Sequence, residues 1–241
     1  SSFDLATATG TANNSLVIQA GDHLWVYDNA NLTVSGTGTL HLEADSPHSS
    51  SGAGDGTGTL TIGSGAAVTT ANTAMTLIAA DFDIVGTLNS GSGNVTIGPA
   101  VAGQALALGT ATSALLTDTE LDLITTTGTL TIGQATTAGS DGAGTSASTL
   151  TSAAITLDEL TQGSKNVTLV SSSTINDDDD TDTSITTSGT LTLTSGAAIG
   201  SSGGSQGLDI DVGTLAITGT SSGNVTVTEA SGLVLGATTV G

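Results

Sequence analysis

The densest group of potential metal ligands in this chain is a run of aspartates close to residue 180. The run consists of Asp177, Asp178, Asp179, Asp180 and Asp182. Carboxylate oxygens are hard ligands of the kind that Ca²⁺ binds, so calcium is the one cofactor that the sequence suggests. Neither the ligand spacing of an EF-hand nor the Gly-Gly-x-Gly-x-Asp nonapeptide is present. The competing interpretation is a solvated acidic loop, which is the usual structure of a charge run.

A second acidic set is spread along the sequence and offers the same kind of oxygen ligand. Its members are Asp81, Asp83, Glu120 and Asp122. The chain carries a net charge of −21, so we expect these carboxylates to repel one another wherever the fold brings them close.

Threonine recurs at alternate positions of several short segments. The residues in question are Thr59, Thr61, Thr129, Thr131, Thr190 and Thr192. In a β-strand alternate residues share a face, so these hydroxyls predict outward ladders. Such a ladder can order water, as in threonine-rich β-solenoid ice-binding proteins, or contact carbohydrate. The alternative is that threonine, being β-branched, simply favours strands and stacks on itself.

The aromatic and histidine residues are few. Trp25 and Tyr27 occupy alternate positions and therefore share one face. They form either an exposed pair that stacks on sugars or a cap over the first coil, and we expect the cap. Among the histidines, His41 lies between two leucines and is predicted to face outward, and no pattern brings it to His23 or His48.

The composition excludes several classes of function. With 1 Lys or Arg against 22 acidic residues, the chain is predicted to bind neither nucleic acid nor an anionic membrane surface. The absence of cysteine excludes disulfides and thiolate metal sites. No apolar run approaches the about 20 residues of a membrane span. A polysaccharide lyase or hydrolase would need clustered carboxylates with a basic partner, and the single Lys165 argues against an enzyme.

A short phrase recurs along the chain and predicts its secondary structure. Residues 128–133 read Gly-Thr-Leu-Thr-Ile-Gly, and close copies occupy 58–63 and 189–193. A variant beginning Asn-Val-Thr occurs at residues 94–97, 166–169 and 224–227. Each copy alternates apolar and polar residues, which predicts a strand with one apolar face. One such strand cannot bury that face alone, whereas stacked copies can.

Apolar–Asp–apolar triplets at residues 82–84, 121–123 and 208–210 predict further strands with the aspartate outward. No segment keeps helical periodicity over 11 or more residues. We therefore predict an all-β fold in which residues 1–241 form a single β-solenoid segment, an excerpt of a longer repeat protein. Irregular loop insertions are expected near residues 43–56, 134–148, 171–187 and 196–207.

Three segments also resemble the repeats of filamentous-haemagglutinin-like surface proteins. They are residues 118–133, 191–199 and 223–227. The resemblance covers most of residues 58–241 and implies a right-handed parallel β-helix at the cell surface or outside the cell. It implies a structural or adhesive fibre rather than an activity.

The predicted function is therefore an extracellular structural or adhesive fibre segment. The predicted partners are other copies of the chain, because the ends of a solenoid present unpaired strand edges, and surface glycans. The alternative functions are an ice-binding or carbohydrate-binding solenoid and, with less support, a polysaccharide-active enzyme.

Overall fold

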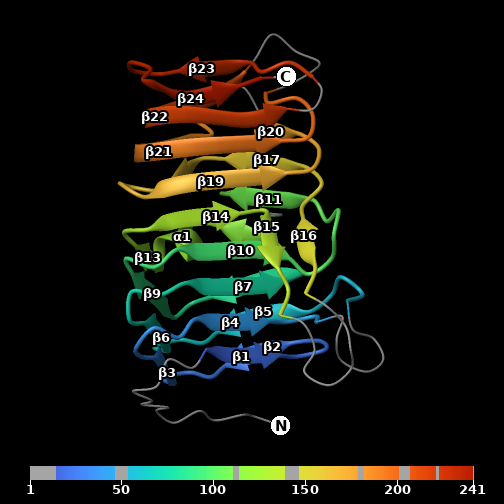
Figure 1. Cartoon of the computed structure of the whole chain (residues 1–241), viewed down its shortest axis with the longest axis vertical. Helices are drawn as coiled ribbons and strands as arrows, with labels where there is room; N and C mark the ends of the chain where they lie inside the picture. The colour runs from blue at the N-terminus through green and yellow to red at the C-terminus, as the bar shows by residue number, and fades with distance from the viewer. Residues whose placement is uncertain are drawn as a thin grey trace.

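The computed structural model describes residues 15–46, 54–110, 114–138, 147–178, 182–200, 207–220 and 223–240. The strands lie on three faces, and Figure 1 shows them crossing the molecule in a stack, with the first strands at the bottom and the last strands at the top. From β1 to β7 each strand pairs in parallel with the strand three places further on. One passage over the three faces is here called a coil. The predicted all-β fold with parallel pairing is thereby confirmed.

Face A is a parallel ladder that runs through the whole stack. It is formed by β1 (Leu16–Gln19), β4 (Leu40–Glu43), β7 (Met75–Ala79), β10 (Val95–Pro99), β14 (Thr129–Ile132), β19 (Asn166–Ser171), the second halves of β21 (Ile185–Ser195) and β22 (Leu208–Thr220), and β24 (Leu235–Thr239).

Face B begins with β2 (Leu24–Val26), β5 (Thr59–Ile62) and β8 (Asp81–Ile84). It continues as a sheet of β12 (Leu116–Thr117), β11 (Leu106–Gly109), β17 (Ile155–Asp158) and β20 (Ile175–Asp177).

Face C contains β3 (Asn31–Val34), β6 (Ala67–Thr70), β9 (Thr87–Gly91) and β13 (Ile124–Thr126). It is continued by β18 (Leu160–Thr161), the first halves of β21 and β22, and β23 (Val227–Glu229).

The core consists of aliphatic ladders inside the stack. On face A one inward row contains Leu40, Met75, Val95, Leu130, Val167, Leu191 and Leu215, each in register with the next. All seven side chains are at most 2% exposed. Burying one such side chain stabilises the fold by roughly 1.5–3 kcal/mol, so a continuous ladder holds each coil to its neighbours. The predicted alternation of Leu130 inward and Thr131 outward is confirmed.

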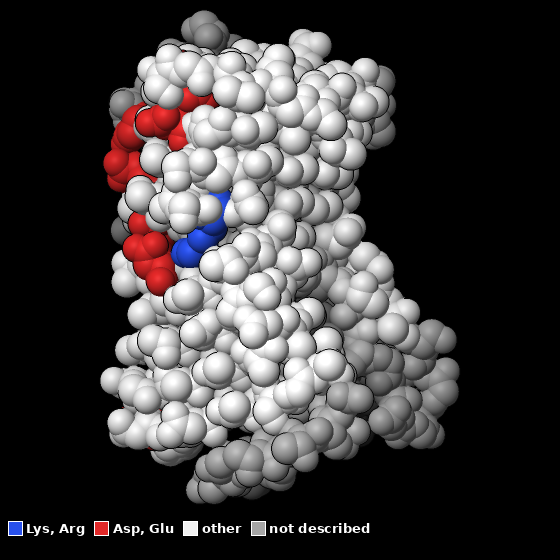
Figure 2. Space-filling view, turned by 60° about the vertical axis from the view of Figure 1, so that its left-hand side comes forward, with Lys and Arg blue, Asp and Glu red and all other residues white. Residues whose placement is uncertain are grey.

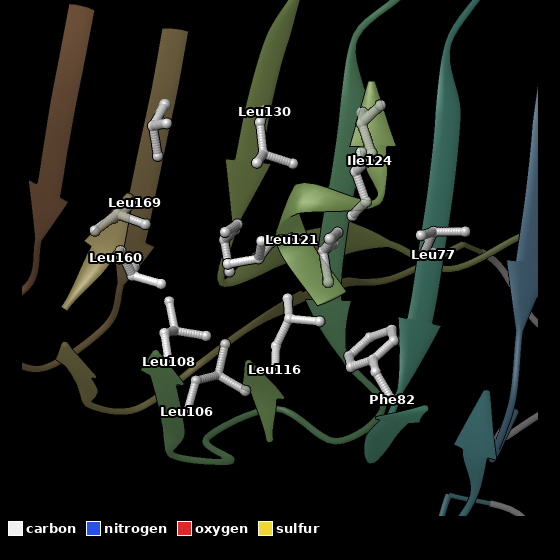
Figure 3. Close-up of a cluster of buried hydrophobic side chains, with 14 of the residues drawn as sticks. Leu77, Phe82, Leu106, Leu108, Leu116, Leu121, Ile124, Leu130, Leu160 and Leu169 are labelled. Carbon is white, nitrogen blue, oxygen red and sulfur yellow. The ribbon is translucent and has the colours of Figure 1, made fainter. Parts of the chain in front are cut away.

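One helix interrupts the strands. The triplets at 82–84 and 208–210 are strands as predicted, but the strand predicted at 121–123 is wrong, because residues Asp118–Asp122 form α1. The reason is a capping box, in which the Thr117 hydroxyl accepts from the Glu120 amide (3.2 Å) and the Glu120 carboxylate accepts from the Thr117 amide (2.8 Å). Leu121 of α1 is fully buried and points into the cluster that includes Phe82 and Leu116 (Figure 3).

The predicted insertions are only partly irregular. Residues 44–46 and 54–58 are irregular as expected, with 47–53 outside the described residues. The segment 171–187, where an insertion was predicted, contains β20 and the start of β21, with irregular backbone at 172–174 and 182–184. In the fourth insertion Ile199 bridges strands on face B, and residues 201–206 lie outside the described part.

The insertion at 134–148 begins as a hairpin. Its arms β15 (Gln134–Thr136) and β16 (Thr149–Thr151) form an antiparallel pair, and Figure 1 shows them lying across the stack rather than within it. The hairpin packs on the outer side of face A, where Ile78, Ala80, Ala100 and Ala135 form a second buried cluster. Gly98 permits this approach, because a Cβ there would collide with Ala135. Across the described residues, no helix has the length and apolarity needed to cross a bilayer.

Candidate functional site

The longest regular array of functional groups is a row of threonines on the outer side of face A. In five consecutive coils Thr76, Thr96, Thr131, Thr168 and Thr192 stand in register. Each of these side chains is half-buried. Neighbouring strands lie about 4.8 Å apart, which sets the spacing of the row.

A second row lies two residues earlier on the same strands and explains the two repeat phrases. It contains Asn94, Thr129, Asn166, Thr190 and Thr214. The Asn94 side-chain oxygen accepts from the Thr129 amide (3.0 Å), and that of Asn166 accepts from the Thr190 amide (3.0 Å). A glycine precedes each of these threonines, and at Gly128 a Cβ would collide with the Asn94 side chain. The Asn-Val-Thr and Gly-Thr-Leu-Thr phrases are thus complementary and alternate from coil to coil.

The six threonines predicted to form outward ladders therefore lie on two different faces. Thr129, Thr131, Thr190 and Thr192 belong to the two rows on face A. Thr59 and Thr61 do not, because they lie on β5 of face B, where Thr61 is in register with Trp25 and Asp83. The sequence prediction missed Thr76, Thr96 and Thr168, although the Asn-Val-Thr phrase contains two of them.

The two aromatic side chains form a pair, as predicted, but not a cap. The ring centroids of Trp25 and Tyr27 lie 5.9 Å apart at an interplanar angle of 61°. Their exposed fractions are 63% and 61%, while Leu24 and Val26 pack against the core. Because Trp25 is in register with Thr61, the pair lies on the outer side of face B beside the first coil, not over its end.

The aspartate run lies at the end of β20. Asp177 is the last residue of that strand, Asp178 and Asp182 are exposed, and Asp179 and Asp180 lie outside the described residues. Within the part that the structure describes, no group of three or more His, Cys, Asp or Glu has a geometry suited to a metal ion. The calcium site remains a prediction.

The second acidic set does come together in part. Asp81 and Asp83 are on β8, and the Glu120 carboxylate accepts a hydrogen bond from the Ile84 amide at the end of the same strand (2.9 Å). Burial raises the pKa of Asp81 above its usual value, and the charges of Glu120 and Asp83 raise it further, against a hydrogen bond from the Phe82 backbone. The predicted repulsion therefore has a structural basis at Asp81.

A buried polar cluster under the hairpin was not predicted. Glu43 is 0% exposed, and its Oε2 lies 2.9 Å from Nε2 of His41 and 3.1 Å from the donating Nε2 of Gln19. The same oxygen accepts from the Ala138 amide (3.2 Å), while the Gln19 amide also donates to the Ala138 carbonyl (2.8 Å). Burial by itself would raise the pKa of Glu43, but hydrogen bonds with His41, Ser46 and Gln19 and the charge of His41 lower it overall. The signal in the sequence is the i, i+2 spacing of His41 and Glu43, which puts both on one face of a strand.

The remaining histidines do not join this cluster. His23 lies before β2 on another face, where its Nδ1 accepts from the Thr59 amide (3.0 Å) and its Nε2 lies 3.4 Å from the Asp22 carboxylate. His48 lies outside the described residues.

The only Lys or Arg side chain of this sequence, that of Lys165, is hydrogen-bonded to α1. Lys165 Nζ donates to the Leu121 carbonyl at the end of α1 (2.9 Å) and to the Gln162 side chain (3.1 Å). Burial lowers the pKa of Lys165, and the nearby charges of Asp122 and Asp118 oppose that shift. Figure 2 shows this side chain in blue, with acidic side chains gathered along one edge of the same face and the rest of the face uncharged.

Comparisons with protein-family models, with curated proteins and with solved structures gave no match to this chain.

Proposed function

We propose that this chain is a segment of an extracellular structural or adhesive fibre, built as a right-handed parallel β-solenoid. The observation that carries the proposal is the unbroken parallel pairing of face A from β1 to β24. In such a stack every coil is held by backbone hydrogen bonds and aliphatic ladders to the coils on either side, which is the architecture of a rod. The repeat style resembles that of filamentous-haemagglutinin-like surface proteins, and this resemblance is the support for an extracellular location.

In this proposal the chain acts mechanically and by contact, without catalysis. Its net charge of −21 keeps the rod soluble and favours neutral or cationic partners over anionic ones. The partners are further copies of the chain and surface glycans.

End-to-end association is supported by exposed aliphatic side chains in the last coil. Leu233, Val234 and Leu235 are 44%, 55% and 62% exposed. Exposed apolar groups beside the strand β24 offer a surface on which another coil can stack.

Sedimentation and electron microscopy of the purified chain test this proposal. We expect filaments or end-to-end oligomers at high protein concentration, and we expect Leu235→Asp to abolish them. Val85→Asp, at a position that is 55% exposed on another coil, is the matched control and should assemble normally. A strict monomer at high concentration and high salt would refute assembly by this segment.

Ice binding is a second candidate, and the two polar rows on face A favour it. Five threonines in register at a spacing of about 4.8 Å form a regular array of hydroxyl and methyl groups that can order water, next to the hairpin that packs on the same side of face A. Thermal hysteresis is the direct measurement. Substituting Thr131 with a bulky Tyr should abolish it if the array binds ice, whereas Thr61→Tyr on face B should not.

A further inference from the structure

The exposed aromatic pair on face B has no role in the fold. The chain has only 2 Phe, 1 Trp and 1 Tyr, yet Trp25 and Tyr27 lie outward on one strand and are more than 60% exposed. The core beneath them is complete without the rings, because Leu24 and Val26 occupy the inward positions. Two large apolar rings held in water at adjacent outward positions are a feature of binding surfaces.

The backbone holds the pair in place before any ligand binds. β2 pairs in register with β5 through Leu24, Trp25 and Val26. Just beyond Tyr27, the Asp28 carboxylate accepts from the Ser64 amide (2.9 Å), and the Asn29 amide donates to the Ser64 carbonyl (2.9 Å). Gly63 permits this close approach, because a Cβ there would meet Asp28 and the Tyr27 backbone. A site on paired strands loses little conformational entropy when it binds.

Polar groups continue the surface of the rings along the stack. Thr61 stands in register with Trp25, and the exposed Asp83 stands in register with Thr61. Rings beside hydroxyl and carboxylate groups match a ligand that presents C–H faces and hydroxyls together.

The charge of the chain and the geometry of the two rings limit the class of polysaccharide that can bind here. Acidic neighbours and a net charge of −21 disfavour sulfated or uronic acid polymers. Rings inclined at 61° cannot both lie flat against one planar ribbon, but they can stack on successive sugar rings that are turned relative to each other.

From this arrangement we infer that Trp25 and Tyr27 form a binding site for a neutral polysaccharide with a twisted chain, each ring stacking on one of two successive pyranose units. Thr61 and Asp83 supply hydrogen-bonding groups to the sugar hydroxyls. This site deepens the proposed adhesive function by naming its glycan class. It does not require assembly, so a monomeric chain that bound the glycan would refute only the proposed fibre.

The single tryptophan makes the first test direct. Trp25 is the only Trp in the chain, so its fluorescence emission reports contact at this site alone. Xylohexaose, a neutral and twisted β-linked chain, is the probe. We expect a saturable change in emission that is insensitive to 0.5 M NaCl, whereas sulfated or uronic acid oligosaccharides should give none. No change up to the solubility of xylohexaose would overturn the inference.

Variants identify the rings by calorimetry. Trp25→Ala and Tyr27→Ala should each weaken xylohexaose binding about tenfold or more, and Trp25→Phe should restore part of it, because the aromatic face is retained. Val17→Ala, which removes exposed apolar surface from β1 on face A, is the matched control and should bind normally. Unchanged melting temperatures show that the variants fold.

Three results would count against the site. Undiminished binding by the Trp25→Ala/Tyr27→Ala double variant would place the glycan elsewhere. Salt-sensitive binding of oligolysine at Trp25 in place of xylohexaose would identify a cation site. A dimer that dissociates in Trp25→Ala would identify the pair as a contact between copies of the chain.

Discussion

Glu43 in the second coil accepts a hydrogen bond from the backbone amide of Ala138, which lies 95 residues further along the chain at the end of the β15 arm. Gln19 in the first coil donates to both of them. The hairpin that follows β14 of the fifth coil therefore extends along face A and is hydrogen-bonded to the first two coils. Stacked coils normally contact only their nearest neighbours, so these hydrogen bonds add cooperativity between coils that are otherwise independent.

The first prediction is that Glu43→Gln loosens the hairpin. The amide replaces a charged acceptor of several hydrogen bonds, and bonds to charged groups contribute about 1.5–3 kcal/mol each before compensation. We expect a lower melting temperature and faster amide hydrogen exchange in β15 and β16. Asp22→Asn, which removes a carboxylate whose side chain is 70% exposed, is the control.

The stabilisation that Glu43 gives by hydrogen bonding to the hairpin should also depend on pH. Because the pKa of Glu43 is lowered in the folded chain, its stabilisation is complete above the unfolded-state pKa and is lost as the pH falls through the folded-state pKa. The titratable groups that face the Glu43 carboxylate include His41, whose Nε2 lies 2.9 Å from it. Wild type should therefore lose its advantage over Glu43→Gln in acid. An advantage that is independent of pH would show that Glu43 acts only by its shape.

The second prediction separates the two sides of one strand. Leu130 is 0% exposed and lies between Val95 and Val167, whereas Thr131 faces outward. Leu130→Asp should lose roughly 1.5–3 kcal/mol of burial and introduce an unpaired buried charge, so several coils should unfold. Thr131→Asp should change the free energy of unfolding by no more than about 0.5 kcal/mol. Urea denaturation measures both, and equal midpoints would refute the assignment of faces.

Most of the fold could be predicted from the alternation of apolar and polar residues along the strands. Residues such as Leu130 and Ile132 define an inward face by local chemistry alone, so the all-β class and the parallel stack follow from the repeats. Helix α1 was missed because the apolar pattern at 121–123 fits a strand equally well, and only the capping box at Thr117 and Glu120 distinguishes the two.

Contacts between residues far apart in the chain could not be predicted from the sequence. The contact between Glu43 and Ala138 depends on how far the hairpin reaches, which no local pattern encodes. The separation of Thr59 and Thr61 from the other threonines likewise depends on which face each phrase occupies, because identical phrases occur on faces A and B.

The third prediction concerns the cap of α1. Thr117→Ala removes the hydroxyl that accepts from the Glu120 amide, and the loss of such a cap costs about 0.5–2 kcal/mol. The helix also joins neighbouring strands, since Glu120 accepts from the Ile84 amide and Asp118 accepts from the Thr161 amide. Thr119→Ala, at an exposed helical position without this bond, is the matched control and should be neutral or slightly stabilising. Equal denaturation midpoints for the two variants would contradict the role of the cap.

The fourth prediction is that Asp81→Asn stabilises the chain at neutral pH. The pKa of Asp81 is raised by burial and by the charges of Glu120 and Asp83, so its ionised form opposes folding. Stability should be gained as the pH falls through the folded-state pKa, and the benefit of Asp81→Asn should disappear where the aspartate is protonated in both states. We expect the gain in melting temperature to shrink in 0.5 M NaCl. Asp22→Asn, at a side chain that is 70% exposed, should show no comparable gain.

The last prediction tests calcium at the aspartate run. Screening and specific binding both relieve repulsion among carboxylates, but they differ in their response to salt. In 0.5 M NaCl the Debye length is only about 4 Å, so further screening by millimolar Ca²⁺ is negligible. Specific binding by Asp177–Asp182 predicts that such Ca²⁺ still raises the melting temperature. At a Ca²⁺ concentration of ten times the dissociation constant, the free energy of unfolding should increase by about 1.4 kcal/mol. The double variant Asp178→Asn/Asp182→Asn should remove this increment while leaving the response to NaCl intact. If NaCl alone reproduces the whole effect of Ca²⁺, the run is a solvated acidic loop and holds no metal.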